Sequence, residues 1–136
     1  MMKPHMFRIV FMEPGRKDVV AANEASLLEA LTELRQQEYP KSINIFSPNG
    51  DILTVALGGR FGFVQHEDAG SPTPRYQMAV ETSLLPGRGI YKEVDAGGTP
   101  TPIPDYACLP AQRVVEIVLA YARTLRLPST VGWREV

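Results

Sequence analysis

The 136-residue sequence holds little of the chemistry on which most enzymes and metalloproteins depend. It contains one cysteine, Cys108, and two histidines, His5 and His66. A single thiol excludes an internal disulfide framework and a zinc site built from several cysteines. The two histidines show neither the His-x-His nor the His-Glu-x-x-His spacing of a metal site. We therefore expect no metal and no cofactor.

An excess of one charge and a long hydrophobic run are also missing. The chain has 14 Lys and Arg residues against 15 Asp and Glu residues, which gives a net charge of −1. Proteins that bind nucleic acid directly usually carry a basic excess or stripe, so we expect no direct contact with nucleic acid. No hydrophobic run approaches the roughly 20 residues of a membrane-spanning helix, and the first residues do not follow the pattern of a signal peptide. These absences predict a cytoplasmic protein that does not contact a membrane.

The rest of the composition is that of an ordinary folded protein. Hydrophobic residues make up 44% of the chain and charged residues 21%. A chain of this length can bury about two-thirds of its unfolded surface, which is enough for one core. Because the sequence also shows no internal repeat, residues 1–136 are predicted to form a single domain.

The first half of the sequence predicts a strand, a helix and a group of strands. Residues 6–12 are predicted to form a strand. Asn23 is the expected N-cap of a helix that ends before Pro40, because the residue before a proline avoids helical backbone. Four leucines fall on one face of that helix: Leu27, Leu28, Leu31 and Leu34. Residues 42–66 predict an antiparallel meander of three short strands, turning at Asn49-Gly50 and at Gly58-Gly59.

The second half predicts two further strands, a helix and a terminal strand. The strands are expected over 76–81 and 90–94, and the last one over 131–136. Proline at every second position from 100 to 104 makes residues 97–104 a loop or a sheet edge, because proline cannot donate to a hydrogen-bond ladder. A helix is expected to start near Pro110 and to end before Pro128. Together these elements predict an α+β fold, an antiparallel meander sheet with two helices packed on it.

A catalytic constellation is not evident. The one local cluster around a histidine is His66, Glu67 and Asp68, and we expect it to be a strand end that runs into a solvated loop. Cys108 precedes a helix, where a thiolate could be stabilised, but its neighbour Leu109 favours a small core residue. A small enzyme that uses His66 and Asp68, or Cys108, therefore stays as an alternative, while the missing catalytic set favours a binding protein.

The C-terminal third of the chain resembles a known family. It combines a Pro-containing lead-in, a helix rich in Val, Ala and Leu, a Leu-Pro break and a terminal Val-Gly-Trp-Arg-Glu, over residues 109–135. Together with the hairpin over 51–64, this pattern is similar to immunity protein family 1 of bacterial polymorphic toxin systems. The resemblance covers roughly residues 43–136. It implies an α+β fold, no enzymatic activity and a role in neutralising a cognate toxin.

The resemblance also implies a partner and two motif residues. Toxins paired with this family are often nucleic-acid deaminases, so we expect the chain to bind such a toxin and to occlude its active site. The family's tryptophan and acidic residue correspond to Trp133 and Glu135. We expect Trp133 to pack the second helix onto the sheet rather than to touch the toxin.

The remaining partner-binding candidates come from the loop-rich middle of the chain. Residues 41–108 carry five Lys and Arg residues against seven Asp and Glu residues, and mildly acidic loops suit a basic partner. The candidates are exposed tyrosines, arginines and acidic residues: Glu67, Asp68, Arg75, Tyr76, Arg88, Tyr91, Glu93 and Asp95. A structural or assembly module that uses a sheet edge or the 97–104 segment is the other alternative, and the free protein is a candidate homodimer.

Overall fold

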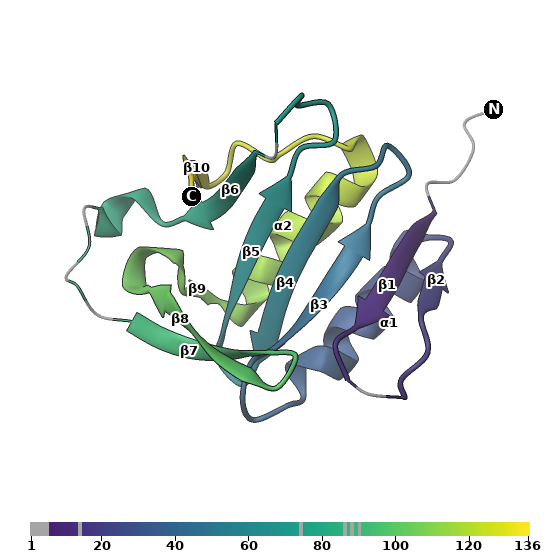
Figure 1. Cartoon of the computed structure of the whole chain (residues 1–136), viewed down its shortest axis with the longest axis horizontal. Coiled ribbons are helices and arrows are strands. Elements are labelled where there is room, and N and C mark those ends of the chain that lie inside the picture. The colour runs from purple at the N-terminus through teal and green to yellow at the C-terminus, as the bar shows by residue number, and fades with distance from the viewer. Residues whose placement is uncertain (1–5, 14, 74, 86, 88, 90) are drawn as a thin grey trace.

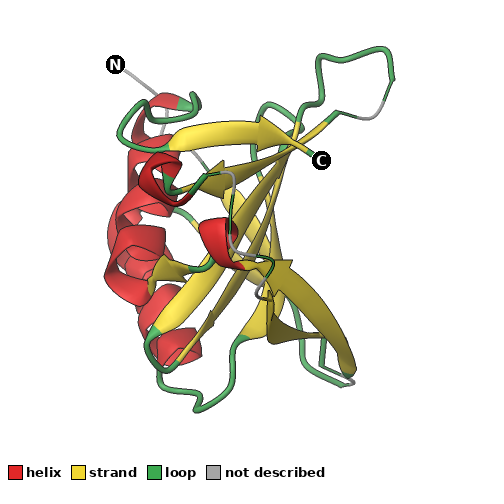
Figure 2. Ribbon diagram, turned by 90° about the vertical axis from the view of Figure 1, so that its left-hand side faces the viewer, coloured by secondary structure: helices red, strands yellow, loops and turns green. Residues whose placement is uncertain are grey.

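The computed structural model describes residues 6–13, 15–73, 75–85, 87, 89 and 91–136. Those residues form a large antiparallel sheet with two α-helices on one face and a hairpin of strands across the other (Figure 1, Figure 2). In chain order the elements are β1 (Phe7–Phe11), β2 (Val19–Ala21), α1 (Glu24–Arg35), β3 (Lys41–Phe46), β4 (Ile52–Gly58), β5 (Phe61–Glu67), β6 (Tyr76–Val80), the 3₁₀ turn η1 (Thr82–Leu84), β7 (Tyr91–Ala96), β8 (Thr99–Pro104), the 3₁₀ turn η2 (Asp105–Ala107), β9 (Leu109–Pro110), α2 (Ala111–Thr124) and β10 (Gly132–Glu135). The predicted α+β fold is confirmed.

The sheet has the strand order β10-β6-β5-β4-β3-β1-β2, and each neighbouring pair is antiparallel. The β3–β4 and β4–β5 hairpins turn at Asn49-Gly50 and Gly58-Gly59, where Gly50 and Gly59 have φ angles of +93° and +61°. Glycine adopts such angles more readily than any other residue, so these turns fix the register of the meander. The predicted meander over 42–66 is confirmed.

The helices start and stop where local sequence signals place them. The Asn23 side chain accepts a 2.8 Å hydrogen bond from the backbone N–H of Ser26, which caps α1 as predicted. The second helix ends after Thr124, because Leu125 adopts left-handed backbone with a φ of 57°. This stop comes three residues before Pro128.

The main core fills the space between the sheet and the two helices. Inward-facing side chains of β1, β3, β4 and β5 meet the apolar faces of α1 and α2 there. Of the four α1 leucines, Leu27, Leu31 and Leu34 are buried, but Leu28 is exposed. The expectation for Leu28 was wrong because it lies 100° around the helix from Leu27, at the rim of the apolar stripe.

A second, smaller core lies on the opposite face of the sheet. Ala56 of β4 and Phe63 of β5 pack there against Val94 and Ile103 of the β7–β8 hairpin. The hairpin is also joined to the sheet by strand pairing, because β7 pairs in parallel with the start of β3 at Asp95 and Lys41. It therefore covers the part of the sheet near the start of β3 and leaves the other part of that face open.

Residues 97–104, expected as a loop or an edge, form most of an edge strand. The strand β8 pairs only with β7, and its prolines stand opposite Tyr91, Glu93 and Asp95. Two short strands, β2 and β9, were missed by the sequence patterns. Among the described residues, neither helix has the length and hydropathy needed to cross a bilayer.

Candidate functional site

Part of the predicted binding set comes together where β5 turns into β6. Glu67 and Tyr76 are directly paired across these two strands, and a hydrogen bond to the Glu67 carboxylate raises the pKa of the Tyr76 hydroxyl. Beside them, the backbone N–H of Asp68 donates to the carbonyl oxygen of Arg75 over 3.1 Å. The Arg75 guanidinium forms a 2.8 Å ion pair with Glu135 of β10. These five residues form one cluster, called here the β5–β6 cluster.

The other predicted residues lie elsewhere. Tyr91, Glu93 and Asp95 alternate along β7, so their side chains share one face of that strand, while Val94 between them is buried in the second core. The Tyr39 hydroxyl donates to Glu93 over 3.4 Å, and Tyr91 is 62% exposed. Residue Arg88 lies outside the described residues.

The two groups lie at opposite ends of the sheet. The β7 group adjoins Lys41, the first residue of β3, whereas the β5–β6 cluster is level with Phe46, the last residue of β3. The predicted binding residues therefore do not form one patch. Of the two groups, the β5–β6 cluster borders the face of the sheet that carries no helices.

Cross-strand pairing lines up the side chains of this helix-free face in two adjacent rows. The outer row runs over five strands and consists of Arg8, Phe46, Ile52, Glu67 and Tyr76. The inner row consists of Val10, Asn44, Thr54, Gln65 and Met78. None of these ten side chains is fully buried. The two rows form a partly apolar surface, called here the open face.

The open face carries few strong internal contacts. The Arg8 guanidinium lies 4.5 Å from the centre of the Phe46 ring and 3.7 Å from the Asp18 carboxylate. The Thr54 hydroxyl donates a 2.9 Å hydrogen bond to the Asn44 side chain. Aromatic, aliphatic and polar side chains are thus mixed on a sheet face that no helix covers, and such patches mark contact surfaces for other molecules.

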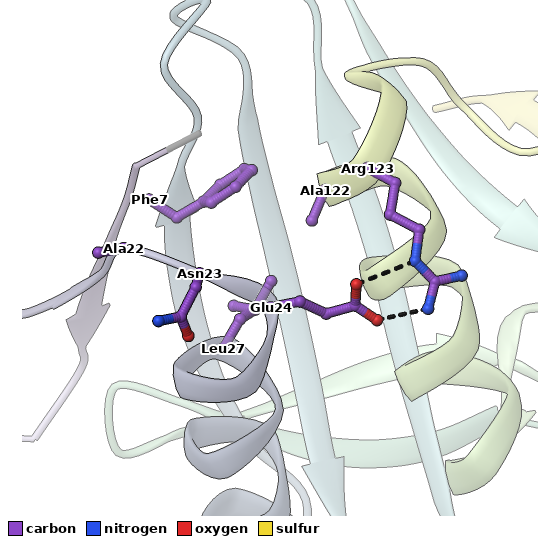
Figure 3. Close-up of a pocket in the computed structure, with 7 residues that line it drawn as sticks. All are labelled: Phe7, Ala22, Asn23, Glu24, Leu27, Ala122 and Arg123. Carbon is purple, nitrogen blue, oxygen red and sulfur yellow. Dashed lines mark hydrogen bonds and ion pairs between the residues drawn. The ribbon is translucent and has the colours of Figure 1, made fainter. Parts of the chain in front are cut away.

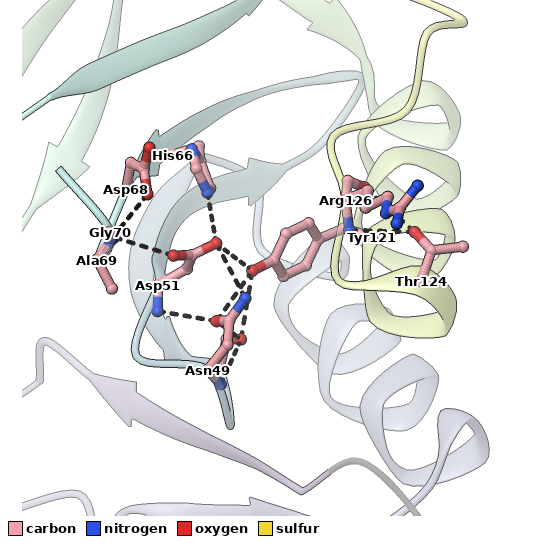
Figure 4. A network of polar contacts seen from close by, with 10 residues as sticks. Asn49, Asp51, His66, Asp68, Ala69, Gly70, Tyr121, Thr124 and Arg126 are labelled. Atoms are coloured by element: carbon pink, nitrogen blue, oxygen red, sulfur yellow. Dashed lines mark hydrogen bonds and ion pairs between the residues drawn. The ribbon is translucent and has the colours of Figure 1, made fainter. Parts of the chain in front are cut away.

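A buried polar network supports the loop beside the open face (Figure 4). Its centre is Asp51, whose carboxylate accepts a 2.7 Å hydrogen bond from the Tyr121 hydroxyl and lies 2.8 Å from Nε2 of His66. The second carboxylate oxygen accepts a 2.9 Å hydrogen bond from the backbone N–H of Ala69. One carboxylate therefore joins α2, β5, the β3–β4 turn and the loop that follows β5.

The environment of Asp51 sets the protonation of the network. Burial alone raises the pKa of a carboxyl group, but hydrogen bonds from His66, Ala69 and Tyr121 outweigh burial and hold the pKa of Asp51 below its usual value. Burial, together with the adjacent Asp51 charge, raises the pKa of Tyr121 to about 12. Asp51 is thus charged and Tyr121 neutral at physiological pH.

The network corrects the expectation for His66. This side chain is 5% exposed and packs at the helix side of the sheet, so it does not lie in a solvated loop. Its partner is Asp51, 15 residues away in sequence, and not Asp68, whose carboxylate accepts from the backbone N–H of Gly70. Among the described residues, Nδ1 of His66 is the one buried side-chain nitrogen or oxygen without a hydrogen-bond partner.

A hollow of about 210 Å³ lies between the N-terminus of α1 and the end of α2 (Figure 3). Phe7, Leu27 and Ala122 form apolar walls, and a two-pronged ion pair between Glu24 and Arg123 crosses its rim. The hydrogen bond from Arg123 lowers the pKa of Glu24. The acid stands at a helix N-terminus and the base in the last turn of a helix, so each charge also suits its helix dipole. This pair fastens the two helices to each other.

A comparison with known families identifies the family of this chain. A family model described as Immunity protein Imm1 matches residues 15–135. The chain belongs to the Imm1 family. Imm1 proteins inhibit toxins without being enzymes, so this Imm1 protein binds and neutralises a cognate toxin. The match also takes in β2 and α1, upstream of the stretch where the resemblance was recognised. No curated protein matches the sequence.

The two motif residues of the Imm1 chain lie on β10. The Trp133 ring packs against the main core, and its Nε1 donates a 3.0 Å hydrogen bond to the carbonyl oxygen of Pro128. The position of Trp133 is therefore that of a residue that packs the end of the chain against the core. Glu135 is exposed and holds Arg75 in the β5–β6 cluster.

The surroundings of Cys108 in this Imm1 protein indicate that its side chain serves packing. Its thiol contacts the second core and lies 3.4 Å from the carbonyl oxygen of Pro104. Burial raises the pKa of the Cys108 thiol, which disfavours the reactive thiolate. Sequence reasoning missed Asp51 and Tyr121, because residues 70 positions apart in the chain meet only through the tertiary fold.

Proposed function

We propose that this Imm1 protein neutralises a nucleic-acid deaminase in the bacterial cytoplasm and that its open face covers the active site of that toxin. The deaminase class follows from the family resemblance, since toxins paired with this family are often deaminases. The observation that carries the proposed surface is the double row of partly exposed side chains on the helix-free face of the sheet.

The chemistry of the open face suits such a partner. Phe46, Ile52 and Tyr76 offer aromatic and aliphatic area of the kind that dominates binding energy at interfaces. Glu67 and Asp68 stand at its end without a basic side chain within ion-pair distance among the described residues. A deaminase that binds nucleic acid needs a basic cleft. Carboxylates opposite such a cleft would speed association and fix orientation.

The proposal is tested by co-expression with the toxin encoded in the adjacent reading frame. The wild-type chain should restore growth, co-purify with the toxin, and abolish its deamination of a single-stranded or double-stranded nucleic acid substrate. A toxin with a different activity would contradict the deaminase assignment. A stable complex in which the toxin still deaminates its substrate would contradict active-site occlusion.

A further inference from the structure

The Asp51 carboxylate divides its two oxygen atoms between the core and a loop (Figure 4). Its Oδ2 is held from the core side, by the Tyr121 hydroxyl at 2.7 Å and by Nε2 of His66 at 2.8 Å. Its Oδ1 accepts a 2.9 Å hydrogen bond from the backbone N–H of Ala69. Asp51 is 8% exposed, and Tyr121 and His66 are buried as well. The carboxylate is therefore a short, rigid bridge from the core to the loop that follows β5.

The loop held through Ala69 carries acidic residues of the β5–β6 cluster. Ala69 follows Asp68 and is the second residue of a turn, in which the backbone N–H of Ser71 donates to the carbonyl oxygen of Asp68 over 3.4 Å. The Asp68 carboxylate caps the same turn by accepting a 2.8 Å hydrogen bond from the N–H of Gly70. This turn lies against the β3–β4 turn, since a Cβ at Gly50 would stand 3.1 Å from the Cβ of Ala69. A shift of Ala69 would therefore also shift the Asp68 carboxylate.

The stability of the fold does not by itself account for this network. Because a carboxylate only accepts hydrogen bonds, Nε2 of His66 is the donor to Asp51, and Nδ1 of His66 stays without a partner among the described residues. A buried nitrogen without a partner costs free energy, and a buried charged network is often no more stable than well-packed apolar residues. Natural chains accept such costs mainly at functional sites. The network therefore indicates a role beyond packing.

We propose that Asp51 is a positioning residue for toxin binding. From inside the core it holds the turn at Ala69 so that the carboxylates of Glu67 and Asp68 face a basic surface of the toxin. This inference rests on the proposed function in that the β5–β6 cluster meets the toxin, but it does not depend on the reaction that the toxin catalyses. A loop that is held before binding need not be ordered in the complex, and its fixed charges steer the partner.

Ala69→Pro tests the bridge from the loop side. Proline has no N–H and suits the second position of a turn, so the turn keeps its shape while its bond to Asp51 is lost, and the charge of the chain does not change. We expect Ala69→Pro to bind the purified toxin about 10-fold more weakly, measured by calorimetry. Its association rate should also depend less on salt, because the carboxylates are no longer held toward the partner. Wild-type affinity of a folded Ala69→Pro protein would overturn the proposal.

Leu34→Ala is the control for a general loss of stability. Leu34 is buried in the main core near the end of α1, and its truncation leaves a cavity there. The melting temperature should fall at least as far as in Ala69→Pro, while the affinity of the folded protein for the toxin stays unchanged. An equal loss of affinity in the two variants would show that any destabilised form binds poorly, and it would remove the special role of Asp51.

A double-mutant cycle tests the route from Asp51 to Asp68. Asp68→Asn keeps an oxygen for the N–H of Gly70 but removes the charge, and we expect it to weaken binding about 10-fold. Combined with Ala69→Pro, the loss should stay near 10-fold, whereas independent sites would give about 100-fold. Full additivity would show that the turn acts on binding by another route, against the proposal.

Tyr121→Phe tests the bridge from the core side and does not depend on Ala69→Pro folding. It removes a donor that fixes the Asp51 carboxylate and leaves every residue of the loop unchanged. The amide of Ala69 should then exchange hydrogen with solvent faster, by a larger factor than the amides of the main core, and the affinity for the toxin should fall about 3-fold. Unchanged exchange at Ala69 would contradict a rigid bridge.

The outcomes also separate this inference from the proposed function. If the wild-type chain binds the toxin but leaves it active, and Ala69→Pro still loses affinity, occlusion is wrong and the positioning role stands. If Asp68→Asn loses affinity and Ala69→Pro does not, the positioning role is wrong and the proposed surface stands. If neither variant loses affinity, the toxin contacts another surface and both proposals are wrong.

Discussion

The Tyr121 hydroxyl donates a 2.7 Å hydrogen bond to the Asp51 carboxylate, so the last turns of α2 are tied to the turn between β3 and β4. Both groups are largely buried, and the bond joins a neutral donor to a charged acceptor. Such bonds are stronger than those between neutral groups. The contact therefore holds the helix layer against the sheet at the end where the β5–β6 cluster lies.

Removing the Tyr121 hydroxyl should destabilise the fold. We expect Tyr121→Phe to lower the free energy of unfolding by about 2 kcal/mol, because Asp51 loses a donor while its charge stays buried. Tyr39→Phe is the matched control, since its exposed hydroxyl makes only a 3.4 Å contact with Glu93; it should cost less than about 0.5 kcal/mol. Urea unfolding measures both, and equal costs would contradict a special role for Tyr121.

The Asp51 network also predicts how stability depends on acid. The folded state holds the pKa of Asp51 below the usual value of 3.8, whereas the unfolded chain does not. The stability that this carboxylate contributes is thus present above about pH 4 and is lost as the pH falls through the lowered pKa of the folded state. Asp51→Asn should flatten this acid limb of the stability profile, measured by thermal melting between pH 2 and pH 7. A profile that stays as steep in the variant would contradict the assignment.

The raised pKa of Tyr121 predicts how the stability of the fold changes at alkaline pH. Its pKa rises from 10.0 in the unfolded chain to about 12 in the folded protein. The folded state therefore favours the neutral phenol, and this contribution is lost as the pH rises from about 10 through about 12. Tyr121→Phe should reduce the loss of stability in that window, with the ionisation of tyrosine followed by its ultraviolet absorbance. An identical loss in wild-type and variant protein would assign the effect to other tyrosines.

Trp133 should act on protection through the fold. Trp133→Ala removes a partly buried ring from the main core and its hydrogen bond to Pro128, at a cost of about 3 kcal/mol. Growth protection should fall in proportion to the unfolded fraction at the growth temperature. Trp133→Phe should recover most of it. Loss of toxin affinity in a Trp133→Ala protein of unchanged stability would instead place Trp133 in the interface.

If the open face contacts the toxin, the two tyrosines of the predicted binding set should contribute unequally to toxin affinity. Tyr76 lies on the open face, whereas Tyr91 lies on the face of β7 turned away from the buried Val94. Tyr76→Ala should weaken toxin binding by about 2 kcal/mol, and Tyr91→Ala by less than about 0.5 kcal/mol. Calorimetry with purified toxin measures both affinities. A larger loss for Tyr91→Ala than for Tyr76→Ala would indicate that the toxin binds the hairpin and not the open face.

Much of the fold could be predicted because short-range chemistry specifies it. Asn49-Gly50 specifies a hairpin and Asn23 supplies a cap, each within a few residues of its cause. The prolines only limit how far the helices can extend, since α1 ends at Arg35 and α2 at Thr124, several residues before Pro40 and Pro128. The short strand β2 escapes such reasoning because three residues give no periodicity. Leu28 shows the limit of a helical stripe, since its burial depends on how far the sheet extends beneath it.

The candidate site was predicted less completely, because tertiary packing creates it. Sequence patterns identified Glu67 and Tyr76 as exposed candidates, and the structure pairs them. They could not show that Glu93 lies at the other end of the sheet, because that depends on where the β7–β8 hairpin docks. They gave no sign of the second core either, since Phe63 and Ile103 meet only when the hairpin folds over the sheet.

The prolines of β8 have a consequence for the behaviour of the protein in a crowded cell. Because Pro100, Pro102 and Pro104 lack an N–H, they occupy the non-hydrogen-bonded positions opposite β7, and the outer rim of β8 presents carbonyl oxygens without donors. A strand from another molecule could form only half of the usual backbone hydrogen bonds there, because β8 offers acceptors without donors. The outer edge of the hairpin is thus protected against the addition of strands from other molecules, the step by which exposed sheet edges aggregate.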